Sequence, residues 1–214
     1  MYQPIQANRY WDRQRQYDQI DWENFQEVVD AFENRIDGWY LNPAQELAKD
    51  GHQAFSVLAL DCLVIDMLSQ FYLGKTRSSM DFFVDYSSNV LGFCKHLNPA
   101  IEYIKTNNNP GTLDTEAKAL YVGFRCGILH EGHIALYGGI DPGQSAVFSF
   151  EYPSTSVKYS DGRDCPSLTI NPLELLNHID REFRRYLTLL KSGTDQLLIN
   201  HFKIKFQSSF GISL

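Results

Sequence analysis

The most constraining feature of this sequence is an apolar stretch that covers residues 52–73. Large apolar side chains occur on nearly every side of a helix drawn over this stretch, rather than along one face. A helix that is apolar all round belongs in the core of a protein or in a membrane. Asp61 and Asp66 interrupt the stretch, so it falls short of the roughly 18 consecutive apolar residues of a membrane span. We therefore predict a central, buried helix that Gly74 ends, and no membrane partner.

Apolar residues spaced three and four positions apart predict further helices around this one. Residues 22–36 form an amphipathic helix with an acidic outer face, which Gly38 and the Asn42-Pro43 pair then break. The other predicted helices are a short turn over 44–50, a helix from Ser79 to about Cys94, a turn over 100–105, a helix from the cap Asp114 to about Glu131, and a helix over 173–190 that starts at the capping Asn171-Pro172-x-Glu174 sequence. For residues 195–206 the pattern fits a helix and an extended segment equally well.

Strand composition is confined to one part of the chain. Residues 146–150, 157–159 and 168–170 are rich in β-branched and aromatic side chains, with turn residues between them. We therefore predict an all-α, up-and-down helical bundle with a small antiparallel β-hairpin or three-stranded insertion around residues 145–170. The expected organisation is an N-terminal extension over 1–20 that packs on the rest, a single helical domain over 21–206, and a C-terminal tail over 207–214.

The charge of the chain is uneven. Residues 18–50 hold nine acids and two bases, a net charge of −7, whereas residues 178–214 have a net charge of +3. An acidic chain is not suited to coat nucleic acid non-specifically, although a local basic groove is still compatible with it. The four cysteines form no CxxC pair, which favours free thiols over a disulfide framework. Because the first 17 residues also lack the apolar segment of a secretory signal, we expect a cytoplasmic protein.

The residue pair that points to chemistry is Arg125 and His130, on a helix that otherwise has the composition of a core helix. Arginine is a permanent cation whose donor fork fits a phosphate group. Histidine can give or take a proton near neutral pH. The two together suggest a phosphodiester site. In an α-helix, however, residues five apart are separated by about 140° of rotation, so the pair diverges unless the helix kinks, as Gly127 would allow.

The helix with Phe124-Arg125-Cys-Gly-Ile-Leu-His130, within a helical bundle and followed by a capped helix from Asn171, resembles the HEPN superfamily. These are small helical proteins of bacterial toxins, defence systems and RNA processing. Their Arg-x4-6-His motif matches at Arg125 and His130. The resemblance implies a metal-independent endoribonuclease without a cofactor, which cleaves single-stranded RNA by attack of the ribose 2′-hydroxyl and leaves a 2′,3′-cyclic phosphate.

The resemblance also implies a homodimer, in which the Arg/His pairs of two subunits face one cleft. Two positions differ from the family pattern. Cys126 stands where many members have a polar residue directly after the arginine. Gly132 stands where toxins with a nucleotidyltransferase antitoxin have a tyrosine, so no such antitoxin is expected as a partner.

Several alternatives stay open at the level of the sequence. Glu131, His133 and Cys126 are secondary candidates for orienting His130 or contacting the substrate. His130 and His133 could instead bind a metal ion, but no third ligand is evident, and no metal site is predicted. Arg125 could also be structural, paired with Asp61 or Asp66. In that case the chain would be a non-catalytic, HEPN-like module that dimerises or binds a nucleotide or a partner protein.

Overall fold

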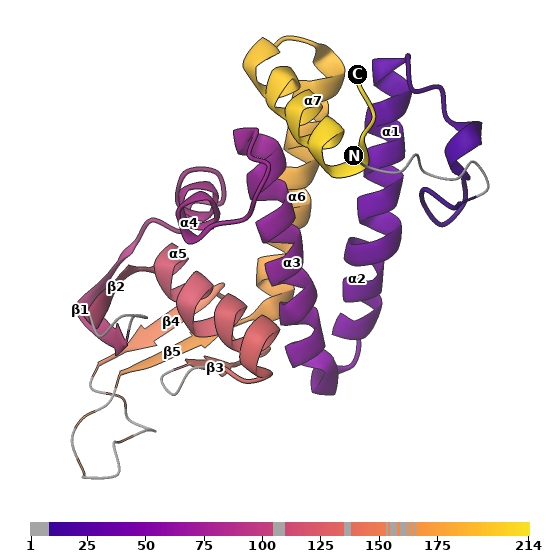
Figure 1. The fold of residues 1–214 in the computed structure, drawn as a ribbon. Coiled ribbons are helices and arrows are strands. Elements are labelled where there is room, and N and C mark those ends of the chain that lie inside the picture. Colours follow the sequence, from indigo (N-terminus) through magenta and orange to yellow (C-terminus); the bar gives the residue numbers. More distant parts are fainter. Residues whose placement is uncertain are drawn as a thin grey trace.

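The computed structural model describes residues 9–104, 110–134, 138–152 and 166–214, together with residues 154, 158, 162 and 164. The protein is mostly helical, with two small sheets (Figure 1). The prediction of a helix-rich bundle is therefore confirmed, whereas the prediction of an all-α protein with a single β insertion is wrong. The sheet that was not predicted lies N-terminal to the expected insertion, where a helical end and a helical turn were expected.

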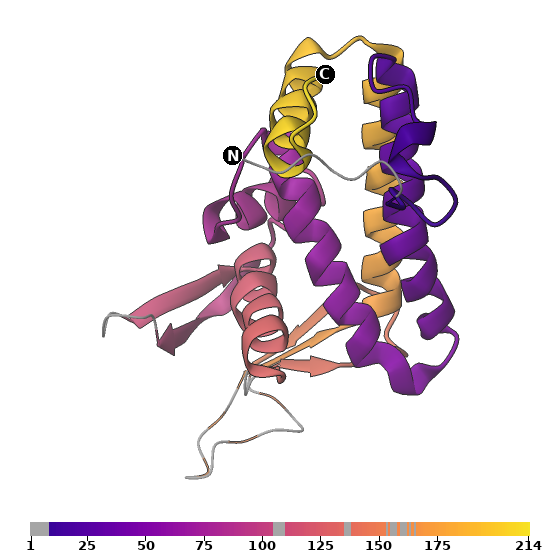
Figure 2. The ribbon, with the colours of Figure 1, turned by 45° about the vertical axis from the view of Figure 1, so that its right-hand side comes forward.

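Helix α3 (Ala54–Leu73) occupies the centre, as predicted from its apolar composition. It packs against α2 (Asn42–Ala48), α4 (Met80–Asn89), α6 (Pro172–Ser192) and α7 (Gln196–Phe210) (Figures 1 and 2). Gly74 ends it in the left-handed region at φ 64°. By length and composition alone, the segment Gly51–Leu73, which includes the short helix η3 (Gly51–Gln53), could also cross a membrane, a test that core helices of soluble proteins pass as well.

The first helices form one nearly continuous rod. Asn24 caps α1 (Phe25–Ile36) by accepting from the backbone N–H groups of its first turn. The predicted break at Gly38 is wrong, because a π-helical turn, η2 (Asp37–Leu41), joins α1 directly to α2. Pro43 lies in the first turn of α2, directly after the π-helical turn, and its ring fixes φ near the helical value.

Helix α4 is shorter than predicted and is followed by strands. It ends at Asn89, and Gly92 at φ 78° turns the chain into β1 (His96–Ile104), which pairs antiparallel with β2 (Pro110–Thr115). The helical turn expected over 100–105 is therefore wrong for the residues that the structure describes. The cap of the next helix, α5 (Glu116–Ala119), is Thr115 rather than Asp114.

The second sheet lies close to the predicted insertion and is mixed. Its strand order is β3 (Gly138–Ile140), β5 (Ser167–Ile170), β4 (Phe148–Glu151). The pairing of β4 with β5 is antiparallel, as predicted, but β3 adds to β5 in parallel and was not predicted. The strand expected over 157–159 lies outside the described residues except for Lys158, which bridges to Asp164.

The last two helices complete the core. The predicted start of α6 is confirmed: the Asn171 side chain accepts from two backbone N–H groups, and Pro172 is the first helical residue. The undecided segment after residue 195 is helical, because Asp195 caps α7, which runs to Phe210. Ile212 is also buried, so the chain beyond the predicted boundary at residue 206 contributes to the core.

The N-terminal extension packs on the domain through a tryptophan. Trp11 is 3% exposed, and its indole N–H donates to the carbonyl oxygen of Ala31 at 3.1 Å. The guanidinium of Arg35 lies over the rings of Trp11 and Trp39, 4.8 and 3.9 Å from their centroids. Residues from Trp11 to Ile20, including the short helix η1 (Tyr17–Gln19), are thus part of the folded unit.

Candidate functional site

The Arg/His pair lies on η4 (Leu120–Glu131), which continues α5 and winds as a π-helix rather than as an α-helix. In a π-helix the backbone hydrogen bonds join residues i and i+5, so residues five apart become neighbours on successive turns. Nη1 of Arg125 lies 2.8 Å from Nε2 of His130. The expected divergence of the pair is therefore wrong, and neither a kink at Gly127 nor a second subunit is needed to bring the two side chains together.

The end of this helix is well defined. Gly132, at φ 71°, occupies the left-handed region that favours glycine, and its N–H donates to the carbonyl oxygen of Gly127. The N–H of His133 bonds to the same carbonyl at 3.2 Å. The winding thus persists to the last turn, which contains His130.

Arg125 is held from the other side by the central helix. Its Nη2 donates to Oδ2 of Asp66 at 2.9 Å, and the two side chains are only 12% and 13% exposed. The hydroxyl of Ser78, in the loop after α3, donates to the other oxygen of Asp66. Burial acts against the charge of Arg125, but the hydrogen bond and the negative charge of Asp66 outweigh it and raise the pKa of Arg125 above its usual value. Arg125 is thus a permanent cation with its own counter-ion.

His130 is exposed, unlike Arg125. The site therefore has a buried anchor, Asp66, a largely buried cation, Arg125, and an imidazole that is open to solvent. Of the two acids that the sequence offered as partners for Arg125, the structure selects Asp66. Asp61 is fully buried elsewhere on α3, and neither of its carboxyl oxygens has a hydrogen-bond partner.

Two of the secondary candidates, Glu131 and His133, lie at the end of η4 or just beyond it. Glu131 and His133 are exposed and pair with each other, with 2.8 Å between Oε2 and Nε2, so the structure does not place Glu131 as the residue that orients His130. Among the described residues, no group of three or more His, Cys, Asp or Glu side chains is arranged to hold a metal ion.

Cys126 lies beside the Arg/His pair. Its thiol is within hydrogen-bonding reach of Arg125 and Tyr121, and the Tyr121 ring centroid lies 5.3 Å from the guanidinium carbon. Burial raises the pKa of the Cys126 thiol, and the charge of Arg125 offsets only part of this increase. Cys126 is therefore a neutral thiol near neutral pH rather than a nucleophilic thiolate. Cys62, Cys94 and Cys126 are free, and Cys165 lies outside the described residues.

Two cavities among the described residues lie away from the Arg/His pair. One of about 460 Å³ lies between α4 and the start of α5, and its lining includes Asp81, Asp85 and Asp114, which would repel a phosphate. Another, of about 230 Å³, is mostly apolar and lies between α2, α3 and the start of α6. Neither has Arg125 or His130 in its lining. The Arg/His pair reaches the surface through His130, which is exposed.

Helix α6 carries a cluster of three arginines, Arg181, Arg184 and Arg185, which lie beside carboxylates. Arg184 bonds to Glu33 and Asp37 on the first rod of helices, and Arg185 bonds to Glu182. The nearby carboxylates compensate the positive charge of these arginines, so the arrangement does not favour a role for them in binding RNA. The net charge of +3 over residues 178–214 therefore does not mark an open basic surface.

Asp66 and Ser78 are the residues of the site that the sequence did not identify as its members. Asp66 was considered only as a structural partner, and Ser78 has no signal of its own because a single serine in a loop is common. No protein-family model, curated protein or solved structure matches this chain. The Arg125–His130 pair is therefore the feature of the chain that points to a function.

Proposed function

We propose that this chain is a metal-independent endoribonuclease of the HEPN type, with Arg125 as the phosphate-binding residue and His130 as the general acid/base. The observation that supports the proposal is the 2.8 Å contact between Nη1 of Arg125 and Nε2 of His130. It places a permanent cation and a proton-transfer group within the span of one phosphodiester, with the imidazole open to solvent.

In the proposed reaction the phosphate of RNA enters at the Arg125–His130 contact, and its oxygens accept from Nη1. The ribose 2′-hydroxyl replaces Nη1 as the donor to Nε2 of His130, and the Nε2 lone pair then takes the hydroxyl proton. The 2′-oxygen forms a bond to phosphorus, the bond from phosphorus to the 5′-oxygen breaks, and the leaving 5′-oxygen takes up the proton that His130 returns. The products are a 2′,3′-cyclic phosphate and a free 5′-hydroxyl.

General principles give the scale of each contribution. Positioned proton transfer accelerates reactions by about 10²–10⁴-fold. Stabilisation of the charge that develops on the phosphate by one oriented donor contributes roughly 10²–10³-fold. As in the resembled family, we propose a homodimer in the cytoplasm, with single-stranded RNA as substrate, in a defence or stress response.

A second candidate function has its own supporting observation. The pairing of Arg125 with Asp66 leaves the site with little net charge and the guanidinium only 12% exposed. A structural arginine would be arranged in this way. The corresponding function is a non-catalytic, HEPN-like module that dimerises or binds a nucleotide or a partner protein, with His130 as a surface residue.

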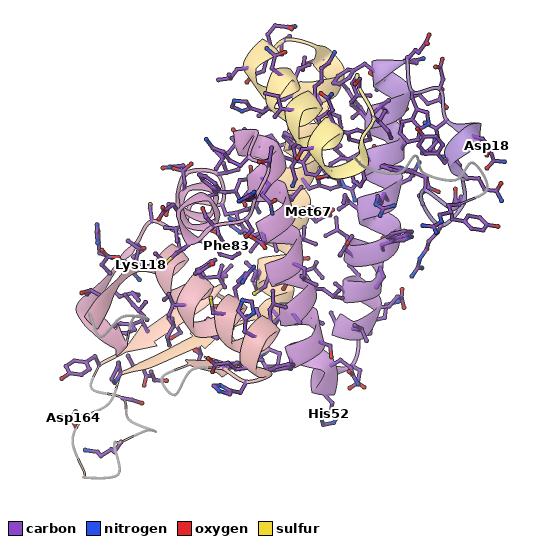
Figure 3. All side chains as sticks on the ribbon, viewed as in Figure 1. Asp18, His52, Met67, Phe83, Lys118 and Asp164 are labelled. Carbon is purple, nitrogen blue, oxygen red and sulfur yellow. The ribbon has the colours of Figure 1, made fainter. Side chains whose placement is uncertain are left out.

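Cleavage of single-stranded RNA in the presence of EDTA separates the two. We compare the unmodified chain with Arg125→Lys and His130→Ala, and expect either change to abolish cleavage and the cyclic phosphate product. His52→Ala is the matched control, because His52 is exposed at the start of α3, roughly 20 Å along the helix from Asp66 (Figure 3).

Stability must be followed in parallel. Removing the Arg125 side chain altogether leaves Asp66 without its partner, which costs about 3 kcal/mol when the pair is buried. His130→Ala removes an exposed side chain and should change stability by less than about 0.5 kcal/mol. Cleavage that is lost in a fully folded His130→Ala protein supports the ribonuclease, whereas cleavage indifferent to this change favours the binding module.

A further inference from the structure

We infer that Asp66 is a positioning residue which, by holding Arg125, fixes the tautomer of His130. The groups that the two side chains offer determine the direction of the hydrogen bond between them. A guanidinium has donors and no acceptor, so in the Arg125–His130 contact the imidazole Nε2 must accept. A neutral imidazole that accepts at Nε2 has its proton on Nδ1. The contact therefore selects the Nδ1–H form of His130.

The contact depends on how Arg125 is held. Nη2 is fixed on Asp66 at 2.9 Å, which leaves Nη1, on the other arm of the planar fork, directed at His130. Asp66 is itself fixed, because Ser78 donates to its second oxygen. Three hydrogen bonds thus connect the loop after α3 with the exposed imidazole at the end of η4.

Among the described residues, Asp66 is the carboxylate that pairs with Arg125. Tyr121 and Cys126, the other groups beside Arg125, are both neutral near neutral pH, since burial raises the pKa of each. The Nε of Arg125 is buried and has no partner. Lys205 of α7 is a second cation near Asp66. Its Nζ donates to Gln70 at 2.8 Å, so it does not take the place of Arg125 on Asp66.

The tautomer matters for the proposed reaction. With the proton fixed on Nδ1, Nε2 is the basic atom, and it lies 2.8 Å from the Nη1 atom that would bind the phosphate. If Asp66 no longer holds Arg125, the imidazole of the free protein reverts to the Nε2–H form that unconstrained histidines favour in water. The atom that faces the entering substrate is then already protonated. Only this kinetic consequence rests on the proposed function.

The experiment is a long-range ¹H–¹⁵N correlation on protein labelled with ¹⁵N-histidine, at mildly alkaline pH, where an imidazole is neutral. His130→Gln identifies the signals of His130. We expect the Nδ1–H pattern in the unmodified chain and a shift towards Nε2–H in Asp66→Asn. Ser78→Ala, which removes an exposed hydroxyl and leaves the core intact, should shift the pattern in the same direction to a smaller extent.

The control is Asp85→Asn, which makes the same change of charge on α4, where Asp85 accepts from Asn89. It should leave the His130 signals unchanged. An Nε2–H pattern in the unmodified chain, or an Nδ1–H pattern that persists in both Asp66→Asn and Ser78→Ala, would overturn the inference.

Kinetics give a second readout that a purely structural role would not move. In folded Asp66→Asn we expect kcat to fall by about 10-fold or more, a scale typical of residues that orient a functional histidine, while KM stays constant or falls because a negative charge has been removed. A rise in KM with constant kcat contradicts the positioning role. If the unmodified chain cleaves no RNA, the proposed ribonuclease fails, and the tautomer measurement still decides the role of Asp66.

Discussion

Replacement of Asp61 by asparagine should make this protein more stable at neutral pH. Asp61 is 1% exposed, and both of its carboxyl oxygens are buried without a hydrogen-bond partner. Burial raises the pKa of Asp61 well above its usual value, so the folded protein keeps this group protonated. The unfolded chain releases the proton above about pH 4, the ordinary range of an aspartic acid. Folding at neutral pH must therefore take up a proton.

The sign of the pH dependence follows from the proton count. Between about pH 4 and the raised pKa of Asp61, the folded state binds one proton more than the unfolded state through this group. The free energy of unfolding then falls as the pH rises, by up to about 1.4 kcal/mol per pH unit. Asparagine does not titrate, so the variant lacks this loss. An Asp61→Leu variant would further remove a buried polar group without a partner, which is worth about 1–3 kcal/mol.

The measurement is urea unfolding of the unmodified chain and of Asp61→Asn over a series of pH values from acidic to neutral. The free-energy difference between the two should grow with pH in favour of the variant. Asp18→Asn, a change at an exposed acid, should run parallel to the unmodified chain (Figure 3). If Asp61→Asn also runs parallel, or is the less stable protein at neutral pH, then Asp61 has a polar partner in solution and the reasoning fails.

Two further changes test the packing of the fold. Trp11→Ala should lower the free energy of unfolding by about 3–5 kcal/mol in urea unfolding, because Trp11 is 3% exposed, and a loss below 1 kcal/mol would show that the extension is not part of the core. Gly74→Ala should lower the thermal midpoint more than Gly193→Ala does: both glycines have φ near +70°, which costs about 1–2 kcal/mol with a Cβ, but only at Gly74 would the Cβ meet the His201 ring, at 2.7 Å. Equal shifts would contradict this difference.

The parts of the fold that could be predicted are those with a local cause. The apolar composition of residues 52–73 dictates a buried helix wherever the neighbours lie, and Asn171 and Pro172 form a start signal within one turn. The β1–β2 hairpin lacks such a signal. Its pairing joins segments on either side of the polar sequence 105–109. The helical pattern of the sequence extends to Cys94, but the chain leaves the helix after Asn89 and turns at Gly92.

The candidate site could be predicted as a pair of residues but not as an arrangement. The residue types of Arg125 and His130 suggest an anion-binding cation beside a proton-transfer group. Their contact depends on π-helical winding, which leaves no mark in a pattern analysed at 3.6 residues per turn. The anchor, Asp66, is separated from Arg125 by 59 positions, so only the packing of η4 against α3 reveals it.

The winding of η4 also determines what a change of chain length would do at this point. A π-helix that loses one residue from a turn regains the hydrogen-bond pattern of an α-helix. Deletion of one residue between Arg125 and His130 would leave the two four positions apart, and an α-helix places such residues on the same face. The spacing that brings the arginine and the histidine together therefore depends on the helical pitch. A deletion or insertion of one residue would keep the two side chains adjacent if the pitch changed with it.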